Sequence, residues 1–425
     1  MAAFATDWLS KKTLFPKFIS EEPAPDTGII AVVPAFDEPD ITGLLDSLLQ
    51  CDRPVCSSEV IIVINAPPGA GLKSLQNNSI CAGHIEKWKH DNESCFFRLY
   101  AIDTGQSSMN DWGVGLARKT GMDEALRRFN AIGNPGGIIV SLDADCNVAT
   151  NYFTALHHEF SSYQERNACS LGFEHPLNGT SYSAETYRHI VYYELHMRYF
   201  YQAMKYTGHP WVFHTIGSAI AFRASAYMKS GGMNRRQAGE DFYMVQKLIP
   251  LGGYFNLRST TVYPSPRMSD RVPFGTGATI SKLISEDKAD FLTFNPYSFR
   301  ELKDLFRCAG SLCGRGEEHL SQIYDSIPPG VKSFLPVMEW VEKMMEISNN
   351  TSSNEAFIKR FFMWFNMFRM VKFLNHVHRS ELCKVPVAEA AAELLRMTGK
   401  RPDGTDALNL LLEYRLSEKE TGNFN

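Results

Sequence analysis

The chain has 425 residues, 44% hydrophobic and 12% aromatic, enough to bury a large core in one extended domain or two. With 43 Lys and Arg against 47 Asp and Glu, its net charge of -4 excludes a global field that attracts nucleic acid or an anionic membrane. The nine cysteines lack a CxxC pair and indicate no disulfide framework. The N-terminus places an acid before its basic residues, the reverse of a secretion signal. We therefore expect a cytoplasmic protein.

Apolar runs alternate with stretches of helical period after a polar lead-in over residues 1–28. The expected strands span residues 29–33, 59–65, 95–103 and 136–142. An amphipathic helical pattern separates each strand from the next. Such an order predicts right-handed crossovers and a mostly parallel sheet covered by helices on both faces. Ligands of such sheets bind outside the carboxyl ends of the strands, which makes this edge the expected site.

The second half of the chain reads differently. A Tyr-rich helix is expected over 184–206, and beyond about residue 279 the pattern is mainly helical. We expect three parts: the lead-in, a catalytic domain over 29–280 and a helical region over 281–425. The apolar stretch 357–377 contains four basic residues, so it predicts a core helix rather than a membrane span, with a surface-lying amphipathic helix as the alternative.

Two acids follow the apolar strand 136–142 directly. Asp143 and Asp145 share one side of the chain because alternate residues of a strand share a face. Two carboxylates held so close repel unless a cation neutralises them, and a hard divalent ion, Mg²⁺ or Mn²⁺, suits oxygen ligands. The alternative is that these acids cap the following helix.

An ordered set of motifs gives the pair its context: "VVPAFDE" (32–38), "GVGLARKTGMDEA" (113–125), "VSLDADCN" (140–147), "IGSAIAFRASAYMKSGGM" (216–233) and "GEDF" (239–242). This set resembles the GT-A glycosyltransferases of family 2 over residues 29–280. The resemblance implies an α/β fold, a Rossmann-like mostly parallel sheet with helices on both faces, here followed by a helical C-terminal extension. It also implies transfer of a sugar from a UDP- or GDP-sugar to an acceptor hydroxyl, with Mg²⁺ or Mn²⁺.

Carried over by position, the resemblance implies roles for individual residues. The expected nucleotide-sugar site comprises Pro34, Phe36, Glu38, Asn65, Asp103, Arg118, Lys119, Asp143 and Ala144. Asn65 stands where the family usually has acids and is expected to contact the base. Asp143 and Asp145 would bind the metal, without a third ligand, because no histidine soon follows "GEDF". Gly217 and Ser218 would line the sugar–acceptor cleft.

The chemistry needs such groups independently of the resemblance. Negative charge grows on the leaving diphosphate, where a metal and cationic side chains stabilise it. An acceptor hydroxyl is a poor nucleophile and needs a carboxylate base. We expect Asp241 to be that base, with inversion of the anomeric centre, and Glu240 to orient the acceptor. Arg267 and Arg271 lie in a stretch that predicts a mobile loop closing on the diphosphate, with a solvated surface loop as the alternative.

Weaker signals and rival functions remain beside this interpretation. Trp211 and His214 precede the cleft glycine and are candidates for stacking on a sugar, although buried aromatics more often fill cores. The acceptor class stays open among glycans, lipid-linked and small molecules. The C-terminal helices are candidates for completing the acceptor site, forming a homodimer or touching a membrane surface. The rivals are a retaining transferase, an aspartate-nucleophile phosphohydrolase and a catalytically silent scaffold; no nucleic-acid partner is expected.

Overall fold

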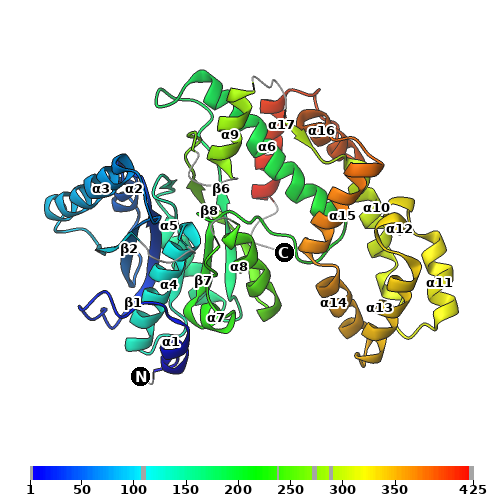
Figure 1. Cartoon of the computed structure of the whole chain (residues 1–425), viewed down its shortest axis with the longest axis horizontal. Coiled ribbons are helices and arrows are strands. Elements are labelled where there is room, and N and C mark those ends of the chain that lie inside the picture. The colour runs from blue at the N-terminus through cyan, green and yellow to red at the C-terminus, as the bar shows by residue number, and fades with distance from the viewer. Residues whose placement is uncertain (1–2, 107–111, 237–238, 270–274, 287–290, 421–425) are drawn as a thin grey trace. The chain divides into compact units, whose positions relative to one another are not determined.

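The computed structural model describes residues 3–106, 112–236, 239–269, 275–286 and 291–420 (Figure 1). The chain divides into two compact units. The first comprises Met1–Tyr187, Phe213–Ser281 and Glu418–Asn425, and the second comprises Arg188–Val212 and Lys282–Ser417. The boundary after Ser281 adjoins the expected one at residue 280. Residues 188–212, expected in the catalytic domain, belong to the second unit, and the chain returns to the first unit at Glu418.

The first unit is built on an eight-stranded sheet with the order β3-β2-β1-β4-β7-β6-β8-β5. Its strands are β1 (Thr27–Ala35), β2 (Ser57–Ala66), β3 (Phe97–Gln106), β4 (Ile138–Ser141), β5 (Asn147–Val148), β6 (Ala168–Phe173), β7 (Ile220–Arg223) and β8 (Tyr254–Tyr263). The pairs β3–β2, β2–β1, β1–β4 and β6–β8 are parallel, whereas β4–β7, β7–β6 and β8–β5 are antiparallel. The expected α/β class with a mostly parallel sheet is confirmed.

Helices accompany this sheet in the described part of the first unit. They are α1 (Thr6–Lys12), α2 (Thr42–Leu49), α3 (Leu72–Asp91), α4 (Val114–Ala131), α5 (Tyr152–Ser162), α7 (Ala224–Lys229), α8 (Glu240–Leu248) with the short η1 (Ile249–Leu251), and the start of α9 (Thr276–Ser285). Gly121 of α4 lets that helix approach the sheet, since a Cβ there would lie 2.9 Å from Val63 Cγ2. Trp88 of α3, Phe97 of β3 and Phe153 of α5 form an aromatic cluster.

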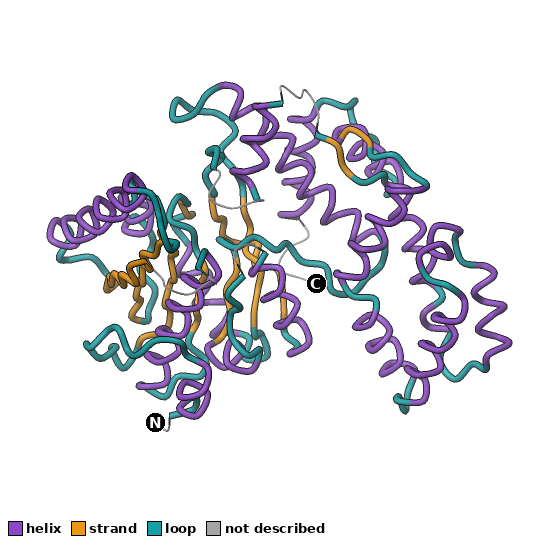
Figure 2. Tube along the Cα trace, in the orientation of Figure 1, coloured by secondary structure: helices purple, strands orange, loops and turns teal. Residues whose placement is uncertain are grey.

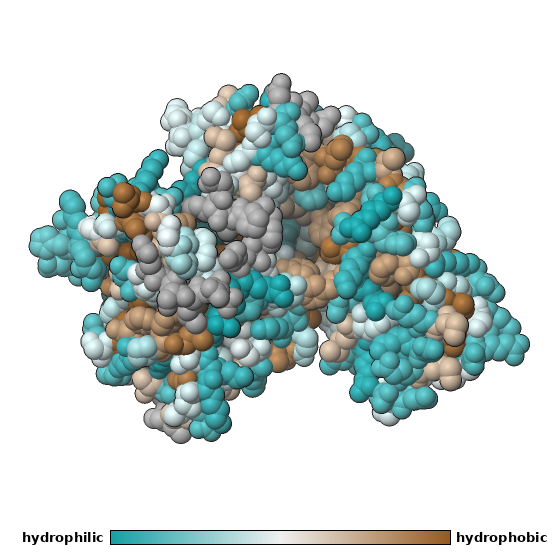
Figure 3. Space-filling view, viewed as in Figure 1, coloured by the Kyte–Doolittle hydropathy of each residue, from teal (hydrophilic) through white to brown (hydrophobic). Residues whose placement is uncertain are grey.

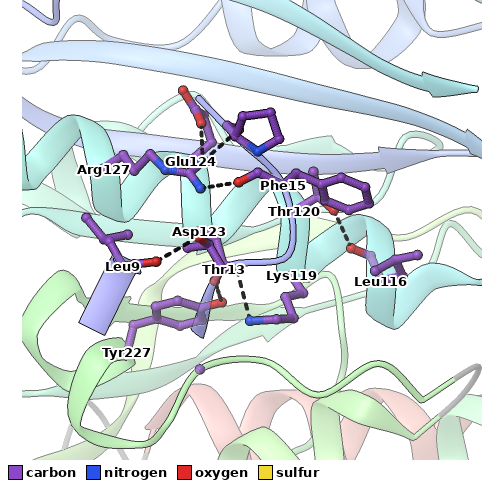
Figure 4. A network of polar contacts seen from close by, with 12 residues as sticks. Leu9, Thr13, Phe15, Leu116, Lys119, Thr120, Asp123, Glu124, Arg127 and Tyr227 are labelled. Atoms are coloured by element: carbon purple, nitrogen blue, oxygen red, sulfur yellow. Dashed lines mark hydrogen bonds and ion pairs between the residues drawn. The ribbon is translucent and has the colours of Figure 1, made fainter. Parts of the chain in front are cut away.

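Hydrogen bonds with residues of α4 hold the N-terminal arm, residues 3–26, and Figure 4 shows part of this network. Glu124 accepts the backbone N–H groups of Phe18 and Ile19, at 3.3 and 3.2 Å. Arg127 donates to the Phe15 carbonyl at 2.5 Å, as Figure 4 shows. Buried backbone groups need partners, and the side chains of α4 supply them. The segment expected as a lead-in is therefore attached to the helix that carries Arg118.

The second unit is mainly helical (Figure 2). Its elements are most of α6 (Ala184–Tyr206), β9 (Leu292–Thr293), α10 (Pro296–Arg307), η2 (Ala309–Ser311), α11 (Glu317–Ser326), α12 (Pro329–Phe334), α13 (Val337–Asn349), α14 (Asn354–Trp364), α15 (Met367–Ser380), β10 (Val385–Pro386), α16 (Val387–Met397) and α17 (Ala407–Glu420), which ends in the first unit. Hydrophilic side chains predominate over α11 and α13 on the face shown in Figure 3.

The apolar stretch 357–377 lies inside this helical unit as parts of α14 and α15. Phe357, Phe361 and Phe373 are fully buried, and Phe306 contacts Phe361 edge-on with 6.2 Å between ring centroids. The expected core packing is confirmed, although two helices replace the single one expected. Among the described residues, no helix combines the length and apolar character needed to cross a membrane.

Candidate active site

The carboxyl ends of the parallel strands bring the predicted residues to one edge of the sheet. In the register, Ala35 pairs with Ile64 and Ile64 with Asp103. Val32 of β1 pairs with Ser141, the last residue of β4. The predicted donor-site residues lie near the carboxyl ends of β1, β2 and β3 (Pro34, Asn65, Asp103), shortly after β1 and β4 (Phe36, Glu38, Asp143, Ala144) and in α4 (Arg118, Lys119). The order of strands thus assembles the edge that the sequence pattern predicted.

Arg118 is the centre of the first cluster at this edge. It is 3% exposed, projects from α4 and pairs through Nη1 with Glu240 and through Nη2 with Asp143. A Cβ on Gly217 would lie 2.5 Å from Nη2, so the absence of a side chain there lets the backbone lie against the guanidinium. Burial lowers the pKa of Arg118, but Asp143 and Glu240 raise it by more, and the net shift is upward. The guanidinium therefore stays charged.

Asp241 lies beside this cluster in the first turn of α8. Gly239 precedes the helix with a φ of 73°, a left-handed conformation that glycine adopts without strain. The Asp241 carboxylate accepts the backbone N–H of Phe242 at 2.7 Å. Loss of solvation, followed by the negative charge of Glu240, raises the pKa of Asp241 to about 7, while Arg118 opposes the rise. A carboxyl poised near neutral pH suits general base chemistry.

Arg267 organises a second cluster on the loop after β8. Its guanidinium binds Glu38 through two N–H groups, one of them 2.8 Å from Oε1. Its Nε also lies 2.8 Å from Asp145 Oδ2. Burial lowers the pKa of Arg267, but the hydrogen bond to Glu38 and the charges of Asp145 and Glu38 together raise it by more. The net shift of the pKa is upward. Arg271, the second predicted clamp residue, lies outside the described residues.

Asp143 and Asp145 have the oxygen donors that Mg²⁺ and Mn²⁺ prefer, and their side chains are 37% and 25% exposed. Each carboxylate nevertheless already pairs with an arginine. Within the described part of the chain, no cluster of three or more His, Cys, Asp or Glu side chains is arranged to hold a metal. The donor chemistry of the pair fits a divalent ion, provided that its ligands exchange partners.

Aromatic and amide groups lie further along the same edge. Phe36 contacts Trp112 edge-on, with 5.5 Å between ring centroids. The Asn65 side chain donates to the Gly113 carbonyl at 3.1 Å, which fixes the start of α4. The side chain of Asp103 is exposed and accepts a hydrogen bond from the backbone N–H of Gly105, two residues on, at 2.7 Å. Sequence reasoning missed Trp112, although a tryptophan directly before the "GVG" motif was a usable signal.

Lys119, a predicted donor-site residue, makes contacts other than the expected ones. The Lys119 ammonium lies 2.9 Å from Asp123, whose other oxygen accepts the hydroxyl of Tyr227 at 2.7 Å (Figure 4). Lys119 therefore points into the packing between α4 and α7 rather than toward the Arg118 cluster. Its position beside Arg118 in the sequence sets it at a different angle around the helix.

The predicted acceptor residues divide between the two units. His214 is buried in the first unit, with Nε2 3.1 Å from a Glu418 oxygen. Trp211 belongs to the second unit, where its backbone N–H donates to His209 at 3.1 Å. Ser218 is 2% exposed and Ala144 is 6% exposed. The His214 side chain thus joins the returning C-terminal segment to the sheet.

Three similar solved structures illustrate the comparisons. The chain is similar to S. aureus TarS 1-349 in complex with UDP-GlcNAc, with 14% identity over 80% of this chain and 93% of that chain, at a TM-score of 0.40. It is similar to mannosyltransferase PcManGT from Pyrobaculum calidifontis in complex with GDP-Man and Mn²⁺, with 15% identity over 98% of this chain and 92% of that chain, at a TM-score of 0.33. It is also similar to glucosyl-3-phosphoglycerate synthase from Mycobacterium tuberculosis in complex with Mn²⁺, UDP-Glc and phosphoglyceric acid. The identity is 13% over 63% of this chain and 84% of that chain, and the TM-score is 0.35. No family model and no curated protein matches the chain. These three structures hold nucleotide sugars, and two of them also hold Mn²⁺.

Proposed function

We propose that the chain is a GT-A glycosyltransferase that moves a sugar from a nucleotide-diphosphate sugar to an acceptor hydroxyl with inversion. One observation carries the proposal: Arg118 joins Asp143, which follows β4, to Glu240, which begins α8. Two acidic motifs almost 100 residues apart thus meet on one buried cation, with Asp241 beside them. This buried ion pair lies where an open α/β sheet binds its ligand, which favours a functional role for it.

Each group has a distinct task in the proposed reaction. Asp241 takes the proton of the acceptor hydroxyl as that oxygen attacks the anomeric carbon, because its pKa of about 7 allows proton uptake near neutral pH. Arg118 pairs with both Asp143 and Glu240, so its charge offsets the acids that lie beside the base. Asp145, with Asp143, would hold Mg²⁺ or Mn²⁺, which would stabilise the charge of the departing diphosphate.

The donor site takes its specificity from the first half of the sheet. Phe36 and Trp112 form an aromatic pair that suits stacking on a nucleoside base. Glu38 contacts Arg267 rather than solvent, so we assign it the positioning of that guanidinium. Glu240 is 2% exposed and bound to Arg118. We therefore assign it the task of positioning Arg118, rather than that of orienting the acceptor.

A donor-binding screen tests the proposal. UDP- and GDP-sugars are added with MnCl₂ or EDTA, and the melting temperature and acceptor-independent hydrolysis are measured. A donor should raise the melting temperature because it binds only the folded state. Asp145→Asn should abolish metal-dependent hydrolysis, whereas the matched change Asp91→Asn on the surface of α3 should not. A chain that neither binds nor hydrolyses any of these donors would not be a transferase of this class.

The stereochemical part of the proposal has its own readout. Once a donor and acceptor are known, proton NMR of the first product gives the anomeric configuration before mutarotation. Direct displacement assisted by Asp241 predicts inversion. Retention of configuration would remove Asp241 from the role of base and leave the donor site intact.

A further inference from the structure

Arg267 already neutralises the carboxylate that the proposed metal needs. The Nε–Oδ2 distance to Asp145 is 2.8 Å. A divalent ion of this kind binds carboxylate oxygens at about 2.0–2.1 Å, so the guanidinium and the ion cannot both lie against the same oxygen. Two cations that close would also repel. Metal binding at Asp145 therefore requires Arg267 to yield that contact.

The contacts of Arg267 are unequal, and this makes a partial release feasible. Glu38 accepts two of its N–H groups, and the Glu38 side chain is 4% exposed. The contact with Asp145 is an ion pair in which Nε makes no hydrogen bond within the described part of the chain, and it lies at a side chain that is 25% exposed. Paired hydrogen bonds from an arginine fork are the stronger kind. Asp145 is therefore the partner that Arg267 loses first.

The backbone around Arg267 is held independently of Asp145. Its N–H donates to the Ser265 hydroxyl at 3.2 Å, and that hydroxyl lies 2.8 Å from the hydroxyl of Tyr182. These contacts, with those to Glu38, keep the loop attached when Arg267 and Asp145 separate. The exchange thus needs a change in one side chain rather than unfolding of the loop.

We propose that Arg267 is a resident counter-ion of Asp145 that a divalent cation displaces, and that the displaced guanidinium edge then binds the donor's diphosphate. This inference rests on the proposed function, since it takes Asp145 as the ligand of the donor's metal. It makes metal and donor binding mutually supportive, because the diphosphate offers Arg267 a new anionic partner when the metal takes the old one. Such coupling is reciprocal between the two ligands.

The test measures binding of MnCl₂ alone, from the electron paramagnetic resonance signal of free Mn²⁺. Arg267→Met removes the competing cation, so it should lower the Kd for Mn²⁺ about tenfold or more. Adding Asp145→Asn to Arg267→Met should abolish the gain, which shows that the ion binds at this carboxylate. UDP should tighten Mn²⁺ binding in the native protein by a larger factor than in Arg267→Met.

Two further variants keep the test decisive. Arg236→Met removes the same charge from an exposed arginine whose guanidinium lies over Tyr243 at 3.9 Å, and it should leave the Kd for Mn²⁺ within about twofold of the native value. Glu38→Gln weakens the hold on Arg267 without removing the guanidinium. Because Glu38 competes with Asp145 for the guanidinium, this change should leave Arg267 more firmly on Asp145 and weaken Mn²⁺ binding, the opposite direction to Arg267→Met. It serves as the test if Arg267→Met fails to fold.

The outcomes separate this inference from the proposed function. Unchanged or weaker Mn²⁺ binding in Arg267→Met, or an equal gain in Arg236→Met, overturns the exchange even if the chain binds a nucleotide sugar. A gain that depends on Asp145, in a chain that binds no nucleotide sugar, supports the exchange of cations and rejects the donor. If Arg267→Met does not fold, Glu38→Gln decides, and an unchanged or lower Kd for Mn²⁺ in that variant overturns the exchange.

Discussion

Replacing Gly217 with alanine tests the packing of the Arg118 cluster directly. The new Cβ would lie 2.5, 2.6 and 2.8 Å from Nη2, Nη1 and Cζ of Arg118, all closer than the 3.0 Å that real Cβ contacts respect. The guanidinium cannot retreat freely, because Asp143 and Glu240 hold it from two sides. Overpacking of this kind costs about 1–3 kcal/mol. We expect Gly217→Ala to lower the free energy of unfolding by that amount.

The assay is urea denaturation followed by tryptophan fluorescence and circular dichroism. Arg118→Ala alone should cost about 3–5 kcal/mol, because it leaves the Glu240 charge buried without a partner. In that background Gly217→Ala should cost almost nothing, since the group it strikes is gone. Gly83→Ala, in α3 with open space around its Cβ, is the matched control and should stabilise by about 0.5–1 kcal/mol. Equal costs of Gly217→Ala in both backgrounds would refute the assigned contact.

Three further predictions concern other groups. Because the pKa of Asp241 is raised to about 7, the base is lost as pH falls, so kcat/KM should decrease about tenfold per unit below that value, and a rate flat from pH 5 to 8 would contradict it. Tyr152→Phe should stabilise the fold by about 1 kcal/mol in thermal denaturation, since its buried hydroxyl has no partner among the described residues; a loss of stability would reveal one. Arg128→Met should destabilise by about 3–5 kcal/mol, because Glu59 is 1% exposed and would keep an unpaired charge, and Arg127→Met should cost less, because the buried Glu124 keeps the N–H groups of Phe18 and Ile19 as donors.

The sheet edge could be predicted from the sequence because strands buried on both faces leave a strong signal. Ile29–Val33 and Val60–Ile64 are almost completely buried, and such runs end where the chain turns polar. The antiparallel strand β7 was not predicted, since the four residues Ile220–Arg223 carry too little pattern to fix a direction. Side-chain partners were harder still. Lys119 and His214 have plausible site chemistry. The angle of Lys119 around α4 decides that it contacts Asp123, and the return of the C-terminal segment decides that His214 contacts Glu418.

The sequence also could not show which side chains pair with Asp143 and Asp145. Sequence spacing identified Asp143 and Asp145 as a pair that needs a cation, and that physical argument holds. It could not identify the cation, because Arg118 and Arg267 come from distant segments and meet the pair only in the folded chain. A charge requirement read from local sequence thus predicts the sign of the partner and leaves its identity to the topology.

The balance of charge at this edge bears on how a donor could enter. Among the described residues, the acidic side chains Glu38, Asp143, Asp145, Glu240 and Asp241 lie around Arg118 and Arg267 there. Protonation of Asp241 near neutral pH reduces this excess only in part. An anionic diphosphate that approached alone would meet net negative charge, and it would also have to draw the arginines from carboxylates that already hold them. A cation that arrives with the donor removes both obstacles at once, since it offsets the charge of the acids and frees Arg267 for the phosphates. Under the proposed function, joint entry of metal and donor would therefore be more favourable than entry of the donor alone.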